Sequence, residues 1–199
     1  DESENFVDSY VCPKQRILTP EDIFSTYGNK SSALFVVSCG KLYKAKLFSA
    51  IRFPERKLHE DEFTFYKVIG ICKTISIVPG KLYFYVQHSD SIMANNKPER
   101  LDSMEAYCYQ AEYFFNRRYI EALNTVRGLS SYWFAEILKS NKIRITDARF
   151  RIAMRFYRRI CTLALRAGCV SRMLIIKSII QKFICTYPLN VVTGRKIKN

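Results

Sequence analysis

Residues 53–66 read FPERKLHEDEFTFY, and the fold prediction starts from their centre, His59-Glu60-Asp61-Glu62. A turn rich in proline and charge delivers three consecutive carboxylates, and an apolar-periodic run to about Ile71 follows directly. This order predicts a helix that begins at Glu60, with acids in the first turn, where backbone N–H groups and the helix dipole favour negative charge. A carboxylate held there would stay ionised near neutral pH, as a general base must. Acids also open many helices purely as dipole partners, so that structural role stays open.

The composition sets the broad class. The chain has 199 residues, of which 48% are apolar and 14% aromatic, so a substantial core is expected and wholesale disorder is not. No apolar run is long enough to span a bilayer, and no signal peptide is recognisable at the start. The first residue is Asp1 rather than Met, so we expect a processed or truncated piece of a longer protein.

The cysteines indicate a reducing compartment. Their number is odd, their spacing is wide and no C-x-x-C occurs, which predicts reduced, mostly buried thiols in a cytosolic protein, with neither a zinc site nor a disulfide framework. The seven are Cys12, Cys39, Cys72, Cys108, Cys161, Cys169 and Cys185.

The positive charge is concentrated at one end of the chain. Residues 1–140 hold 18 Lys/Arg against 17 Asp/Glu, a balance of +1, whereas residues 141–199 hold 14 bases and the single acid Asp147, a balance of +13. A near-neutral body with a strongly basic end indicates a polyanionic partner, either nucleic acid or an anionic membrane surface.

The remaining pattern predicts an α+β, mostly helical chain. Residues 1–18 appear irregular, and Thr19-Pro20-Glu21-Asp22 predicts a short helix that stops near Gly28. Residues 33–37 are either a buried strand or a short helix. Residues 74–78 and 82–86 read as two strands, antiparallel or nearly so, joined at a Pro79-Gly80 turn. Helical spacing follows over residues 100–115, 119–139, 147–167 and 170–187.

The last two predicted helices are basic and amphipathic. At 100° per residue, five arginines fall on one narrow face of the first of them, and apolar residues cover much of the rest. This stripe fits a helix that lies among lipid headgroups. A core helix with a solvated basic face is the alternative that stays open. The arginines are Arg151, Arg155, Arg158, Arg159 and Arg166.

Five short blocks occur in order within residues 34–93: Gly40-Lys41-Leu42-Tyr43-Lys44, Ile51-Arg52-Phe53-Pro54, His59-Glu60-Asp61-Glu62-Phe63, Leu82-Tyr83-Phe84-Tyr85 and Ser91-Ile92-Met93. Together they resemble the second half of the catalytic domain of bacterial family 2 glycosyltransferases, the GT-A-fold enzymes of capsule, O-antigen and exopolysaccharide biosynthesis. The family pattern looks like N-K-L-Y-K, i-R-F-P-E-G, h-E-D-E-x-F, L-Y-Y-Y-R and S-I. This sequence has Gly40 where the family has Asn, and Val86 where the family has Arg. Residues 97–199 resemble the family only in their general character of variable, basic, amphipathic helices.

The resemblance implies a division of the chain and a missing part. Residues 1–96 correspond to the acceptor-side part of a GT-A-like catalytic domain, and residues 97–199 to a helical C-terminal region with basic amphipathic helices. The family's nucleotide-sugar motifs, V-P-x-Y-N, D-D-G-S and D-x-D, do not occur in this sequence. The chain therefore resembles a truncated transferase that is silent alone and has no cofactor of its own, with Mg²⁺ or Mn²⁺ expected in the full-length enzyme. The missing half would supply the central strands of the sheet. Without it, exposed strand edges can pair with a second copy, so self-association is a further alternative.

The resemblance also implies roles for particular residues. Asp61 would be the general base that deprotonates the acceptor hydroxyl, and Glu60 would orient it or contact the acceptor. Lys41 would bind the diphosphate or pair with an acid, and His59 would contact substrate or simply precede the helix. Tyr83 and Tyr85 would stack on a sugar or belong to the core. His88 has no companion ligands, so no metal site is expected here.

The partners follow from these roles. They are a nucleotide-sugar donor, a glycan or lipid-linked acceptor, and an anionic membrane surface contacted by residues 147–187. Nucleic acid is not expected in this scheme, and the place of action would be cytoplasmic, peripheral at the inner face of the bacterial membrane. The alternative left open is a non-catalytic basic helical module that binds anionic membrane or nucleic acid and needs nothing from the acid cluster.

Overall fold

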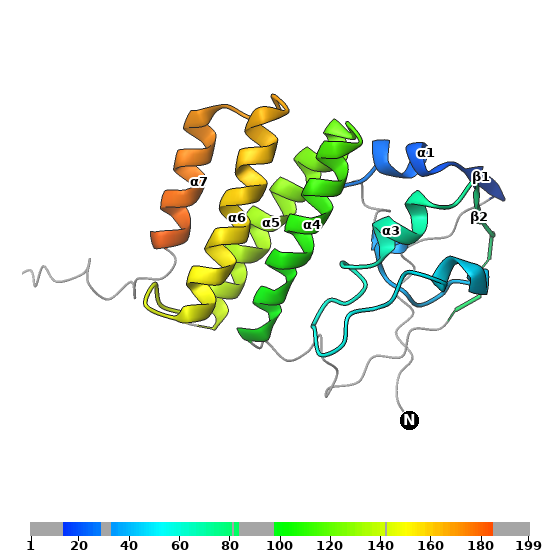
Figure 1. Cartoon of the computed structure of the whole chain (residues 1–199), viewed down its shortest axis with the longest axis horizontal. Helices are drawn as coiled ribbons and strands as arrows, with labels where there is room; N and C mark the ends of the chain where they lie inside the picture. The colour runs from blue at the N-terminus through cyan, green and yellow to red at the C-terminus, as the bar shows by residue number, and fades with distance from the viewer. Residues whose placement is uncertain (1–13, 29–32, 81, 84–97, 142, 185–199) are drawn as a thin grey trace, which may run out of the picture.

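The computed structural model describes residues 14–28, 33–80, 82–83, 98–141 and 143–184 (Figure 1). Within these ranges the chain is mostly helical, with one two-stranded sheet. The predicted α+β, mostly helical class is therefore confirmed. No helix among the described residues combines the length and the apolar character that crossing a membrane requires.

The elements follow one another along the chain in a simple order. A small sheet and short helices come first, and four long helices follow. They are β1 (Arg16–Leu18), α1 (Pro20–Ser25), α2 (Ala33–Val36), the 3-10 helix η1 (Ala45–Phe48), α3 (Phe65–Gly70), β2 (Ile75–Ile77), the 3-10 helix η2 (Pro98–Asp102), α4 (Ser103–Asn116), α5 (Ile120–Ser140), α6 (Ala148–Arg166) and α7 (Arg172–Ile184).

The four long helices lie alongside one another and form the helical body, with α7 at its outer edge (Figure 1). Helix α4 packs on both α5 and α6, so its inner side is almost wholly buried. The small elements α1, α3 and the β1–β2 sheet gather at the other side of α4 (Figure 1). Helix α1 also packs on α5, so α4 and α5 together form the surface to which the first part of the chain is attached.

The helix predictions hold where local signals are strong. At α1 the Thr19 hydroxyl accepts from the Asp22 N–H at 3.2 Å, and the Asp22 carboxylate accepts from the Thr19 N–H at 2.8 Å, a complete capping box. At α6 the Asp147 carboxylate accepts from the Arg149 N–H at 2.8 Å. Gly168, with φ +73°, lies between α6 and α7, where a break was predicted. The run at residues 33–37, left open by its pattern, contains helix α2.

Strand β2 has a partner that the sequence pattern did not indicate. It pairs antiparallel with β1, with Leu18 opposite Ile75. The partner predicted from the sequence was residues 82–86. Leu82 and Tyr83 belong to no strand, and residues 84–86 lie outside the described residues. The irregular prediction for residues 1–18 is wrong at β1, because three residues are too few to reveal an alternating pattern.

An aromatic cluster joins α1, α3 and α4. Phe114 of α4 is fully buried, and its ring lies 5.0 Å from that of Phe24 and 5.6 Å from that of Tyr113, centroid to centroid. Tyr113 in turn makes an edge contact with Tyr66 of α3 at 5.0 Å. Aromatic pairs add specific geometry to apolar burial, so α3 is held in one position on α4. The expected division at residue 96 falls within 84–97, outside the described residues.

Two helical glycines provide a matched test of this packing. A Cβ added at Gly70 would overlap the Tyr113 hydroxyl, whose ring is held by Phe24, Tyr66 and Phe114, whereas nothing lies within 4 Å of a Cβ added at Gly128. We predict that Gly70→Ala lowers the free energy of unfolding by about 1–3 kcal/mol through overpacking.

Gly128→Ala is the control for the same chemical change. It should raise the stability by about 0.5–1 kcal/mol, since alanine favours a helix interior and space is open there. Urea unfolding followed by circular dichroism measures both. Equal and positive effects of the two substitutions would show that α3 does not pack on Tyr113 as described.

Candidate functional site

The acid cluster lies before helix α3 and not in its first turn, so the predicted helix start at Glu60 is wrong. Residues 59–64 form successive turns: the Glu62 N–H donates to the His59 carbonyl at 3.0 Å, and the Phe65 N–H to the Asp61 carbonyl at 2.9 Å. Residues 63–66 are all buried, and one face of a helix cannot bury four consecutive side chains. His59 has φ +60°, in the left-handed region, which also favours a turn.

Asp61 is partly buried, and its environment acts against its charge. Its Oδ1 accepts from the Glu62 N–H at 2.9 Å, which favours the ionised form. Burial is the larger effect and raises the pKa of Asp61, and the nearby Glu60 raises it further. The expected stabilisation of the carboxylate by a helix N-terminus is therefore wrong, and the direction of the pKa shift is the opposite.

Glu62 is the acid that the structure holds most firmly. The Gln110 amide of α4 donates from Nε2 to the Glu62 carbonyl at 2.8 Å and to its Oε2 at 2.7 Å. The Tyr107 hydroxyl lies 3.5 Å from Oε1, and the Tyr27 hydroxyl donates to Gln110 Oε1 at 3.3 Å. Burial raises the pKa of Glu62 to about 7 despite the lowering effect of Gln110 and Tyr107, with Asp61 adding to the rise. The cluster is thus fastened to α4 by partly buried hydrogen bonds, and Gln110 of α4 is bonded in turn to Tyr27 of the segment after α1.

Lys41 comes close enough to Asp61 for their charges to interact. Its Nζ donates to the Val37 carbonyl, and burial lowers its pKa, while Cys39 and Asp61 act in the opposite direction. Among the described residues, Lys41 donates to the carbonyls of Val37 and Cys39 and not to Glu60, which is exposed. A lysine held beside a partly buried acid can balance negative charge at that place.

Tyr83 packs on Gly40, the residue that precedes Lys41. Gly40 has φ +67°, and a Cβ added there would lie 3.5 Å from the Tyr83 ring, so the tyrosine packs over the backbone next to Lys41. The ring is 55% exposed. Tyr85 lies outside the described residues. The structure thus places Tyr83 against Gly40, the residue before Lys41, and places Lys41 within range of the Asp61 charge.

His59 faces the helical body instead. Burial lowers the pKa of the His59 imidazole, and Arg100 lowers it further. Next to it, a surface hollow is lined by Arg56, Lys57, Leu58, Glu99 and Asp102. Lys57 spans this hollow, with its Nζ 2.7 Å from Glu105 and 3.7 Å from Asp102. Lys57 thus ties the loop to η2 through Asp102 and to α4 through Glu105.

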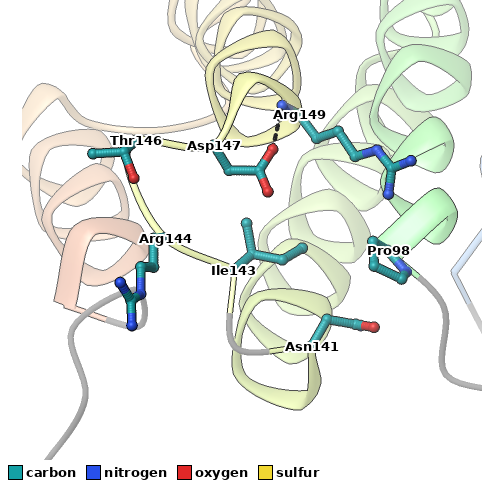
Figure 2. A pocket seen from close by; sticks show the side chains of 7 residues that line it. All are labelled: Pro98, Asn141, Ile143, Arg144, Thr146, Asp147 and Arg149. Carbon is teal, nitrogen blue, oxygen red and sulfur yellow. Dashed lines mark hydrogen bonds between the residues drawn. The ribbon is translucent and has the colours of Figure 1, made fainter.

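A second hollow lies at the connection between α5 and α6. Figure 2 shows its lining side chains, with Asp147 bonded to the N–H of Arg149. The Arg149 guanidinium also lies 2.8 Å from Glu99. Both charged groups thus have structural roles. The lining residues are Pro98, Asn141, Ile143, Arg144, Thr146, Asp147 and Arg149.

The ligand chemistry of the described residues is limited. No group of three or more His, Cys, Asp or Glu side chains gathers there in a way that could hold a metal ion. The described cysteines are free thiols: Cys108 and Cys161 are buried, and Cys39, Cys72 and Cys169 are partly buried. Cys12, Cys185 and His88 lie outside the described residues.

Comparisons with protein-family models, with curated proteins and with solved structures found no match to this chain. The resemblance to family 2 glycosyltransferases therefore stays a prediction that rests on the quoted motifs.

Glu62 should make the stability of the chain pH-dependent. Its pKa is about 7 in the folded state against an ordinary value of 4.5, so the folded state binds a proton more readily than the unfolded one. The stabilisation is complete below the unfolded pKa and is lost as the pH rises through 7. We predict that Glu62→Gln, which mimics the protonated acid, removes about 2 kcal/mol of the fall in unfolding free energy between pH 5 and pH 8.

The control is Glu55→Gln, the same change at an exposed acid in the preceding turn. It should leave the pH dependence of the unfolding free energy as in the unmodified chain. Urea unfolding at a series of pH values gives the comparison. If Glu62→Gln and Glu55→Gln show the same pH dependence, Glu62 is not a buried acid of raised pKa.

Proposed function

We propose that this chain is the acceptor-side part of an inverting glycosyltransferase with a GT-A-like catalytic domain. It would help to move a sugar from a nucleotide-sugar donor to a polysaccharide or lipid-linked glycan at the cytoplasmic face of a bacterial membrane. The observation that supports this most is that parts of three quoted motif blocks are neighbours: Tyr83 of the fourth block packs on Gly40 of the first, and Lys41 of the first interacts electrostatically with Asp61 of the third.

In this proposal Asp61 takes the proton of the acceptor hydroxyl. The hydroxyl oxygen forms a bond to the anomeric carbon of the donor while the bond from that carbon to the diphosphate breaks, and the diphosphate leaves with the electron pair. A base works best when its pKa lies near the working pH. The burial that raises the pKa of Asp61 moves it in that direction.

Glu62 acts in the proposal as a positioning residue. It follows Asp61 directly, and both its carbonyl and its carboxyl are bound by Gln110 of α4. A catalytic group must be held within a fraction of an ångström of its working place, which a buried bond to a long helix provides. Glu60 is exposed and is left free to face an acceptor.

Lys41 and Tyr83 would contact the substrates. Lys41 supplies a positive charge beside Asp61, which suits the diphosphate that leaves. Tyr83 offers a half-exposed ring on which a sugar can stack. The Mg²⁺ or Mn²⁺ that the resemblance implies finds no set of ligands among the described residues, so no step is assigned to it here.

The exposed apolar side chains near the small sheet support the proposal that a further part of the enzyme covers this surface. A two-stranded sheet is marginal alone, and apolar side chains near it are largely exposed. In a complete transferase, the nucleotide-binding part would cover these side chains. They are Ile17 (68% exposed), Ile71 (57%), Val78 (58%) and Leu82 (73%).

A second candidate function needs no chemistry. The chain would then be a basic helical module that binds an anionic membrane or nucleic acid, and the exposed arginines of α6 favour it. In that case the acid cluster would be a structural turn alone. Substitution of Asp61 separates the two candidates, because a binding module has no use for this carboxylate.

The proposal predicts the effect of Asp61→Asn in the complete gene product. Asparagine keeps the shape and the bond from the Glu62 N–H but cannot accept the proton, so kcat for sugar transfer should fall by about 10²–10⁴-fold. The KM for the nucleotide sugar should be unchanged. Turnover with purified nucleotide sugars and a lipid-linked acceptor measures both constants.

Glu55→Gln is the control, since this acid is exposed and near the cluster in sequence. It should retain the kcat of the unmodified enzyme. Unchanged turnover in Asp61→Asn would remove Asp61 from the role of base. A reading frame upstream of Asp1 that encodes no nucleotide-binding region with a D-x-D motif would remove the transferase proposal itself.

A further inference from the structure

The outer face of α6 carries a stripe of positive charge. Four of the five arginines that the sequence placed on one face, Arg151, Arg155, Arg158 and Arg166, are exposed and form no ion pair with a described carboxylate. The fifth, Arg159, is also exposed but lies 2.9 Å from Glu112 of α4. The face was thus predicted correctly, and its charge is available to an outside partner.

Buried polar contacts fix the orientation of α7 on the helical body. Lys182 is fully buried, and its Nζ donates to the Ser131 hydroxyl of α5 at 3.0 Å and lies 5.4 Å from the centre of the Tyr157 ring of α6. The hydroxyls of Ser131 and Ser178 lie 2.9 Å apart. Ile175 and Ile179 pack against the core on the same side. This side of α7 therefore faces inward.

The opposite side of α7 is apolar and uncovered among the described residues. Met173 is 62% exposed, Ile176 54% and Ile180 51%, and the exposed Lys177 lies among them. Residues at spacings of three and four share one helix face, so these four form a continuous outward strip. Neither α6 nor α7 contains an acidic residue. The two helices are neighbours, and α7 lies at the edge of the molecule (Figure 1).

We propose that these two strips form a docking face for an anionic phospholipid bilayer. The face consists of Arg151, Arg155, Arg158 and Arg166 of α6 with Met173, Ile176, Lys177 and Ile180 of α7. The arginines would bind headgroup phosphates, and the α7 side chains would enter the boundary between headgroups and acyl chains. This inference is independent of the transferase chemistry, since it uses none of the residues of the acid cluster.

Charge and apolarity together select the bilayer among anionic partners. Nucleic acid would pair with the arginines, but its phosphate backbone offers nothing to three exposed apolar side chains. A second copy of this chain would bring the same positive charge to the interface and repel it. An anionic bilayer satisfies both parts of the face, and it is also where a lipid-linked acceptor would be found.

The test is co-sedimentation of the full chain with vesicles of phosphatidylcholine, with and without phosphatidylglycerol. The chain should sediment with the vesicles that contain phosphatidylglycerol and should not bind those of phosphatidylcholine alone. The triple variant R151Q/R155Q/R158Q should bind at least tenfold more weakly, and M173S/I176S/I180S should lose binding at physiological salt. The control K44Q/K46Q/R52Q removes as many exposed charges at the other end of the molecule and should bind as the unmodified chain does.

Circular dichroism establishes that each variant is folded, so lost binding can be assigned to the face. Three results would overturn the proposal. One is equal weakening by the control and by the α6 variant. The second is tight binding to duplex nucleic acid without binding to anionic vesicles. The third is a dimer in light scattering that the α7 variant converts to a monomer, because a second copy would then occupy the face. None of these assays measures sugar transfer.

Discussion

The amide of Gln110 is the contact on which the first part of this structure depends. It binds both the carbonyl and the carboxyl of Glu62, while Tyr27 of the segment after α1 binds its oxygen. A desolvated carboxyl group is tolerated where its oxygens find partners or where its pKa rises toward neutrality, and both hold for the partly buried Glu62. The turn that carries Asp61 is thereby joined to α4, the central helix of the molecule. The aromatic contacts among Tyr66, Tyr113 and Phe114 secure α3 at the same place.

Local signals predicted the helices well and the turn and sheet poorly. A capping box and a 3.6-residue apolar period are complete within their own segments, so α1 and the four long helices could be found from the sequence. The pairing of β2 with β1 joins residues far apart in the chain, and nothing in either short strand specifies its partner. The acid cluster looked like a helix start because acids favour one. In the structure, residues 59–64 form turns, and helix α3 begins only at Phe65.

The candidate site was predicted from the sequence in part. The quoted motifs pointed to Lys41, Asp61 and Tyr83. Lys41 interacts electrostatically with Asp61, and Tyr83 packs on Gly40 next to Lys41. The basic stripe of α6 followed from helical periodicity alone. Gln110 and Tyr107 could not be found in this way. They lie in the middle of an ordinary amphipathic helix, and only the fold shows that they face Glu62 across 45 to 48 residues of sequence. The direction of the Asp61 pKa shift was missed for the same reason, since burial is a property of the packed chain.

The account depends on a carboxyl group that is buried against α4 next to the proposed base. The most direct measurement is a pH titration of the Glu62 side-chain carboxyl carbon by NMR in the full chain. The structure predicts a midpoint near pH 7, well above the ordinary 4.5. A midpoint at or below 4.5 would contradict the account, because it would mean that burial against α4 does not dominate the environment of the Glu62 carboxyl group.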